Sequence, residues 1–121
     1  MFESVDWRIF INALSKEMAQ KVINRLSEVI GEIEILKLEQ YWKDKSQYEL
    51  ECKTKLIIQE PEKAVFYVLQ LVSQLGGEIN VIGPNPHGSN NVVFEGVCSS
   101  PTLVGLSWFY FYIDNYGSLF D

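Results

Sequence analysis

The side chains that could act as a nucleophile, a base or a metal ligand are few and scattered. The chain holds one histidine, His87, and two cysteines, Cys52 and Cys98. A zinc or iron site needs several such ligands together, and a Cys-His nucleophile is recognised by geometry that one histidine in a turn-rich stretch does not establish. Cys52 falls on the inward face of a predicted strand and is interpreted as a small core residue. We therefore expect no catalytic residue, no metal site and no cofactor.

Paired carboxylates occur at alternate positions, at Glu32 and Glu34 and again at Glu49 and Glu51. Alternate residues of a strand share one face, so each pair could supply an acid and a base. Glycosidase-like chemistry would require one carboxyl group to be desolvated so that its pKa rises. Basic side chains lie on or near the same face, at Lys37, Lys53 and Lys55. The pattern therefore favours a solvated, salt-bridged sheet surface.

No glycine-rich phosphate loop follows a predicted strand. The stretch GGEIN lacks the GxGxxG or Walker spacing, and GPNPHG has prolines where backbone amides would be needed. The last basic side chain is Lys63, so residues 64–121 carry acidic charge only, at Glu78, Glu95, Asp114 and Asp121. Binding of nucleic acid would need clustered cations, so we expect no nucleic-acid partner.

The remaining candidate is the run SWFYFYI at 107–113, with five consecutive aromatic residues. Strand alternation sends Phe109, Phe111 and Ile113 to one face, which suits a core. The other face receives Trp108, Tyr110 and Tyr112. Each has an apolar body and a hydrogen-bonding tip, the side-chain type that is enriched in protein interfaces. That second face either binds a partner or is covered by the chain's own second helix or its end, Tyr116 to Phe120. The predicted partner-binding residues are Trp108, Tyr110, Tyr112, Glu95, Asp114, His87 and Asn90.

Hydrophobic periodicity predicts the elements that position these residues. The first six are a strand at 7–13, a helix at 16–30, strands at 32–38 and 48–58, a helix at 61–75 and a strand at 78–82. A loop at 83–91 then precedes strands at 92–97 and 103–113, whose order in the sheet stays open. We predict an α+β fold, ferredoxin-like βαββαβ with an added C-terminal β-hairpin and two helices on one face of a mainly antiparallel sheet.

Length and composition indicate one folded domain over 1–121. The chain has 121 residues, 47% hydrophobic and 21% charged, and a formal net charge of -6. The start, MFESVDWR, lacks the basic and apolar regions of a secretory signal, and no stretch reaches the ~20 apolar residues of a membrane span. Two cysteines fit a reducing compartment, although a disulfide between them stays open. We expect a cytoplasmic protein with no membrane association.

The whole profile resembles that of bacterial immunity proteins of polymorphic and contact-dependent toxins: small, single-domain, acidic and without catalytic motifs. The resemblance spans the full chain, is compositional and architectural, and transfers no individual residue. It implies a non-catalytic protein-binding domain that binds and neutralises a cognate toxin, basic and nuclease-like. The alternative is a ferredoxin-like small-molecule-binding regulator or enzyme with a pocket at the sheet or at a dimer interface. A homo-oligomer is compatible with either reading.

Overall fold

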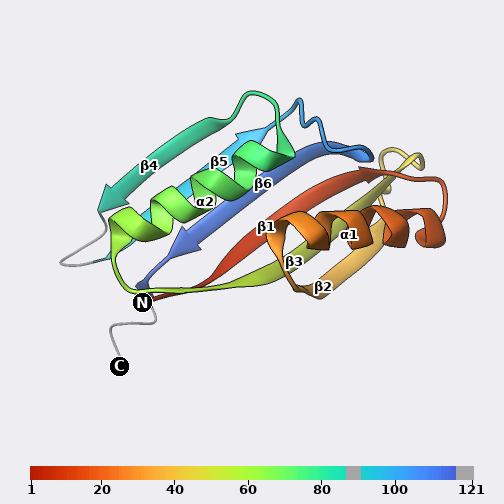
Figure 1. The fold of residues 1–121 in the computed structure, drawn as a ribbon. Coiled ribbons are helices and arrows are strands. Elements are labelled where there is room, and N and C mark those ends of the chain that lie inside the picture. Colours follow the sequence, from red (N-terminus) through yellow and green to blue (C-terminus); the bar gives the residue numbers. More distant parts are fainter. Residues whose placement is uncertain (87–90, 117–121) are drawn as a thin grey trace.

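A computed structural model describes residues 1–86 and 91–116 of the chain. Its elements, in chain order, are β1 (Phe2–Asn12), α1 (Lys16–Ile30), β2 (Ile33–Gln40), β3 (Gln47–Ile58), α2 (Pro61–Leu75), β4 (Asn80–Pro86), β5 (Val92–Cys98) and β6 (Leu106–Asp114). Both helices lie on one face of a six-stranded antiparallel sheet (Figure 1). The predicted α+β class is confirmed. Neither described helix has the length and apolar character that crossing a membrane requires.

The strand order is β2-β3-β1-β6-β5-β4, and all neighbours run antiparallel. Strand β3 lies between β1 and β2, as the split βαβ arrangement of ferredoxin-like folds requires. Strand β6 occupies the place beside β1, where a plain βαββαβ sheet would have its fourth strand. Strand β4 therefore lies at the outer edge, and the added hairpin of β5 and β6 lies inside the sheet (Figure 1).

This topology separates the charges of the sheet. Strands β4, β5 and β6 all come from the part of the chain after residue 63, which contains no Lys or Arg. Because these three strands are adjacent, one half of the sheet has no basic side chain on its own strands. The other half, formed by β2, β3 and β1, carries all the basic residues of the sheet.

Helix α1 begins where Ser15 caps it, with the Met18 N–H donating to Ser15 Oγ at 3.2 Å. It ends at Gly31, whose φ of 92° is a conformation that glycine adopts at low cost. The helices bury one stripe each against the sheet, at Ala19, Val22, Ile23, Leu26 and Ile30 of α1 and at Ala64, Val68, Leu71, Val72 and Leu75 of α2. Each fully buried large side chain contributes about 1.5–3 kcal/mol, and the helix stripes pack on the inward side chains of the sheet to form one core.

The start of the predicted loop at 83–91 is wrong, because β4 continues to Pro86. Pro84 and Pro86 lack a backbone N–H and are therefore unusual in a central strand. An edge strand has one side without a partner, so prolines are tolerated there. They also make the edge a poor template for another strand.

Candidate functional site

The two faces of β6 differ as the alternation predicts. Phe109, Phe111 and Ile113 are at most 1% exposed and belong to the core under the helices. Trp108, Tyr110 and Tyr112 are partly exposed on the opposite face, which we call the open face of the sheet. Helix α2 therefore does not cover them (Figure 1). The other predicted cover was the end of the chain, Tyr116 to Phe120, and residues 117–121 lie outside the described part.

An aromatic row crosses the open face beyond the residues predicted from sequence. Phe10 of β1 pairs with Trp108 of β6, and their ring centroids are 5.4 Å apart. Tyr41 follows at 4.7 Å from Phe10, and Trp42 at 6.2 Å from Tyr41. Trp42 is 80% exposed in the turn after β2. A tryptophan next to the polar residues 43–46 could have indicated from sequence that Trp42 is exposed. The pairing of Phe10 with Trp108 could not be predicted in this way, because it depends on the strand order.

Two tyrosines further along β6 bind carboxylates. Tyr110 Oη donates to Glu95 Oε1 at 3.2 Å, and Tyr112 donates to Asp114. Burial, together with the Glu95 charge, raises the pKa of Tyr110 to about 12. Burial and the Asp114 charge raise the pKa of Tyr112 as well. Both phenols therefore stay protonated and keep the carboxylates oriented.

Five of the seven predicted partner-binding residues thus lie together on the open face: Trp108, Tyr110, Tyr112, Glu95 and Asp114. The remaining two, His87 and Asn90, lie outside the described residues.

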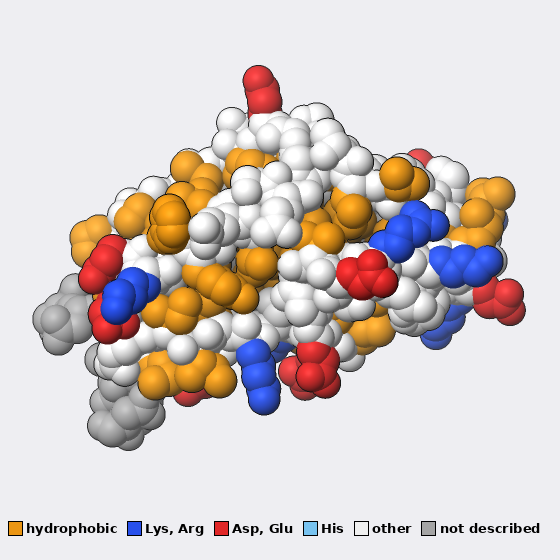
Figure 2. Space-filling view, viewed as in Figure 1, with side chains coloured by type: hydrophobic (Ala, Val, Ile, Leu, Met, Phe, Trp, Pro, Cys, Tyr) orange, Lys and Arg blue, Asp and Glu red, His pale blue; other side chains and the backbone are white. Residues whose placement is uncertain are grey.

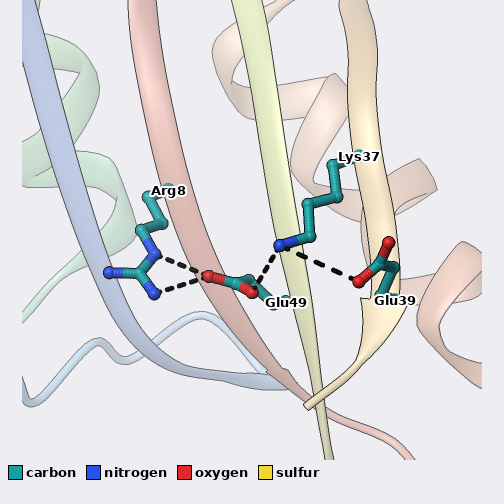
Figure 3. A network of polar contacts seen from close by, with 4 residues as sticks. All are labelled: Arg8, Lys37, Glu39 and Glu49. Carbon is teal, nitrogen blue, oxygen red and sulfur yellow. Dashed lines mark hydrogen bonds and ion pairs between the residues drawn. The ribbon is translucent and has the colours of Figure 1, made fainter. Parts of the chain in front are cut away.

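Charges on the β1, β3 and β2 half of this face neutralise one another (Figure 3). Glu49, only 7% exposed, accepts from Arg8 Nε at 2.7 Å and from Lys37 Nζ at 3.1 Å. Lys37 also lies 3.8 Å from Glu39. Burial alone would raise the pKa of Glu49, but the hydrogen bonds from Arg8 and Lys37 outweigh it and lower that pKa. The predicted ion pairing is confirmed for Glu49 with Lys37, but the predicted solvation is wrong for Glu49, which is buried and stays ionised because Arg8 and Lys37 donate to it.

Within the described part of the chain, the carboxylates Glu95 and Asp114 on the β6, β5 and β4 half of the open face lack such cationic partners. Among the described residues, no Lys or Arg forms an ion pair with Glu95 or Asp114. Both accept a hydrogen bond from a tyrosine hydroxyl, and Asp114 Oδ1 also accepts from the backbone N–H of Tyr116 at 3.1 Å. None of these donors carries a charge at neutral pH. The open face is therefore self-neutralised on one half and negatively charged on the other.

The helix face has an apolar surface of its own (Figure 2). Phe66 and Leu69 of α2 are 63% and 38% exposed. With Pro84 and Pro86 of β4 they line a groove of about 510 Å³. The wide apolar arc of α2 is thus only partly covered by the sheet.

Groups for covalent chemistry lie in the interior. Cys52 and Cys98 are both free and buried, and burial raises the pKa of the Cys52 thiol to about 12. Within residues 1–86 and 91–116, no three His, Cys, Asp or Glu side chains gather closely enough to hold a metal ion. No protein-family model matches the chain, and searches of curated proteins and of solved structures find no significant match.

Proposed function

We propose that the chain is a non-catalytic protein-binding domain that uses the open face of its sheet. The observation that carries the proposal is the partly exposed set of Trp108, Tyr110 and Tyr112 on a face without a helix. Aromatic residues with a polar tip bury much area at a small entropic cost, and they dominate binding hot spots. Trp42, 80% exposed, extends this surface toward the β2–β3 turn.

The partner that we propose is a basic protein domain. The chain has a net charge of -6, and Glu95 and Asp114 have no cationic partner among the described residues. Such a surface accelerates encounter with a positively charged protein and disfavours acidic ones. A basic nuclease-like toxin is one such partner, and the domain would then act as an immunity protein that occludes it. Two free buried cysteines fit a cytoplasmic location for this role.

Affinity capture with matched baits tests the proposal. The baits are the native chain, the Trp108→Ala/Tyr110→Ala variant and a control, Phe66→Ala/Leu69→Ala, that alters the helix face. We expect one stoichiometric basic partner with the native and control baits, and a loss of affinity of roughly 30-fold or more with the open-face variant. Circular dichroism of each bait checks folding. Equal capture by all three baits, or no partner from the source cells, would count against the proposal.

A second candidate is the binding of an apolar small molecule between α2 and β4. The observation behind it is the groove of about 510 Å³ lined by Val65, Phe66, Leu69 and three prolines. Ligand pockets have volumes of roughly 300–1,000 Å³ and mostly apolar linings. The same set of variants separates the two functions, since a groove ligand would be lost with Phe66→Ala/Leu69→Ala and kept with Trp108→Ala/Tyr110→Ala.

A further inference from the structure

Three aromatic rings line a hollow of about 300 Å³ on the open face, beside the β2–β3 turn: Phe10, Tyr41 and Trp108. The planes of Phe10 and Tyr41 are inclined by 59°, and those of Phe10 and Trp108 by 57°. The rings therefore form a curved wall and do not stack flat on one another. Aromatic faces carry negative electrostatic potential, which attracts cations.

Aromatic rings at this end of the sheet already hold cations of the protein itself. The Arg8 guanidinium carbon lies 5.3 Å from the centroid of Phe10. Lys43 Nζ lies 5.0 Å from the centroid of Trp42, a ring that does not line the hollow. Neither Arg8 nor Lys43 lines the hollow. Arg8 nevertheless contacts Phe10, which is one of the three rings of the wall.

Asp44 is the charged residue among those that line the hollow. Ser107 Oγ donates to Gln47 Oε1 at 2.6 Å, and Gln47 Nε2 donates to Asn12. Asp44 Oδ1 accepts from the Ser46 hydroxyl at 2.6 Å and from its backbone N–H at 3.0 Å. These two bonds lower the pKa of Asp44, so its carboxylate is ionised at neutral pH. Among the described residues, Asp44 Oδ2 has no hydrogen bond.

We propose that this hollow binds the guanidinium group of an arginine on the partner. The plane of the guanidinium lies against the aromatic wall, and one of its N–H groups donates to Asp44 Oδ2. Arginine fits better than lysine because its planar group stacks on aromatic rings while its edge binds a carboxylate. The inference rests on the proposed function, and it identifies the side chain by which the partner is anchored.

A neutral-ended arginine tests the hollow without the partner. The probe is N-acetyl-arginine methylamide, and its control is the citrulline analogue, which has a similar shape and no charge. In titrations of ¹⁵N-labelled protein, we expect the arginine probe to shift the Trp108 indole N–H saturably, with a Kd of about 1–10 mM. We expect no saturable shift with citrulline.

Two matched variants remove one negative charge each. Asp44→Asn keeps Oδ1 as an acceptor for Ser46, and we expect it to weaken arginine binding by about fivefold. Glu28→Gln, at an exposed position of α1 on the opposite face of the sheet, should leave the affinity unchanged. Equal shifts with arginine and citrulline, or equal affinity in Asp44→Asn and native protein, would overturn the inference.

Failure of the arginine site and failure of the proposed function give different experimental results. If the hollow does not bind the probe while Trp108→Ala/Tyr110→Ala still abolishes capture of a partner, the proposed function stands and this inference fails. If the probe binds as expected and no partner is captured, the hollow is confirmed as a guanidinium site and the proposed function fails.

Discussion

Tyr110 on β6 donates a hydrogen bond of 3.2 Å to Glu95 on the neighbouring strand β5. The residue directly opposite Glu95 is Tyr112, so the bond runs diagonally across the strand pair. The bond holds the Glu95 carboxylate against β6 and orients the Tyr110 phenol on the open face. The stability of the sheet and the electrostatics of the proposed interface therefore depend on the same pair.

Tyr110→Phe tests this bond through its pH dependence. The folded pKa of Tyr110 is about 12, above the ordinary 10.0, so the bond stabilises fully below pH 10 and is lost as the pH rises through 12. We expect Tyr110→Phe to lower the free energy of unfolding by about 1 kcal/mol at pH 8, and by less at pH 11. Urea unfolding at both pH values measures the difference. Tyr67→Phe, on the exposed side of α2, is the control and should change neither value. A pH-independent effect of Tyr110→Phe would contradict the assignment.

Glu49 gives the opposite pH dependence. Its folded pKa is lowered below the ordinary 4.5, so its contribution is present above pH 4.5 and is lost as the pH falls through the folded pKa. We expect Glu49→Gln to destabilise the protein by about 1–3 kcal/mol at pH 7, because Arg8 and Lys37 lose the negative charge that they share and one of its two acceptor oxygens becomes an NH2 donor. The deficit should shrink toward pH 3 in denaturant titrations. Glu39→Gln, whose side chain is 68% exposed, should cost less than about 0.5 kcal/mol, and a similar loss in both variants would contradict the bridging role of Glu49.

The elements of this fold were largely predictable because their signals are local. Ser15 and Gly31 delimit α1 by capping chemistry, and the alternation of apolar residues defines β3 and the core side of β6. Strand β4 was predicted too short because proline argues against a strand, and the edge position that permits Pro84 and Pro86 is a tertiary property.

The open face could be predicted only in part. Alternation places Trp108, Tyr110 and Tyr112 on one side of β6 from sequence alone. Their neighbours depend on β6 pairing with β1, a contact between residues about a hundred positions apart that no local pattern encodes. For that reason the row that joins Trp108 to Phe10 and Tyr41 emerges only from the strand order.

The Trp7 indole shows how the core accommodates polar groups. Its Nε1–H donates to Thr54 Oγ1 at 3.0 Å, and both residues are at most 3% exposed. Thr54→Val keeps the shape but leaves the indole N–H buried without an acceptor, so we expect a loss of about 1–3 kcal/mol in chemical denaturation. Thr54→Ser retains the hydroxyl, and its loss should come only from the missing methyl group, about 1 kcal/mol. A Thr54→Val protein as stable as Thr54→Ser would show that the bond does not contribute.

Gly96 is required by the size of the ring opposite it. Gly96 on β5 pairs directly with Phe111 on β6, and a Cβ built at Gly96 would lie 2.6 Å from the Phe111 ring. That ring cannot easily move, because it is fully buried and lies 5.5 Å from Phe94 and 6.2 Å from Trp7 between centroids. We therefore expect Gly96→Ala to destabilise the protein by about 1–3 kcal/mol through overpacking, measured by urea unfolding.

A double-mutant cycle separates this steric conflict from a general weakness of β5. Phe111→Leu alone should also destabilise, because it leaves space beneath the helices. In the double variant, the alanine methyl group occupies part of that space, so the combined loss should be smaller than the sum of the single losses by at least about 0.5 kcal/mol. Additive losses would mean that Gly96 serves the backbone of β5 and not the packing of Phe111.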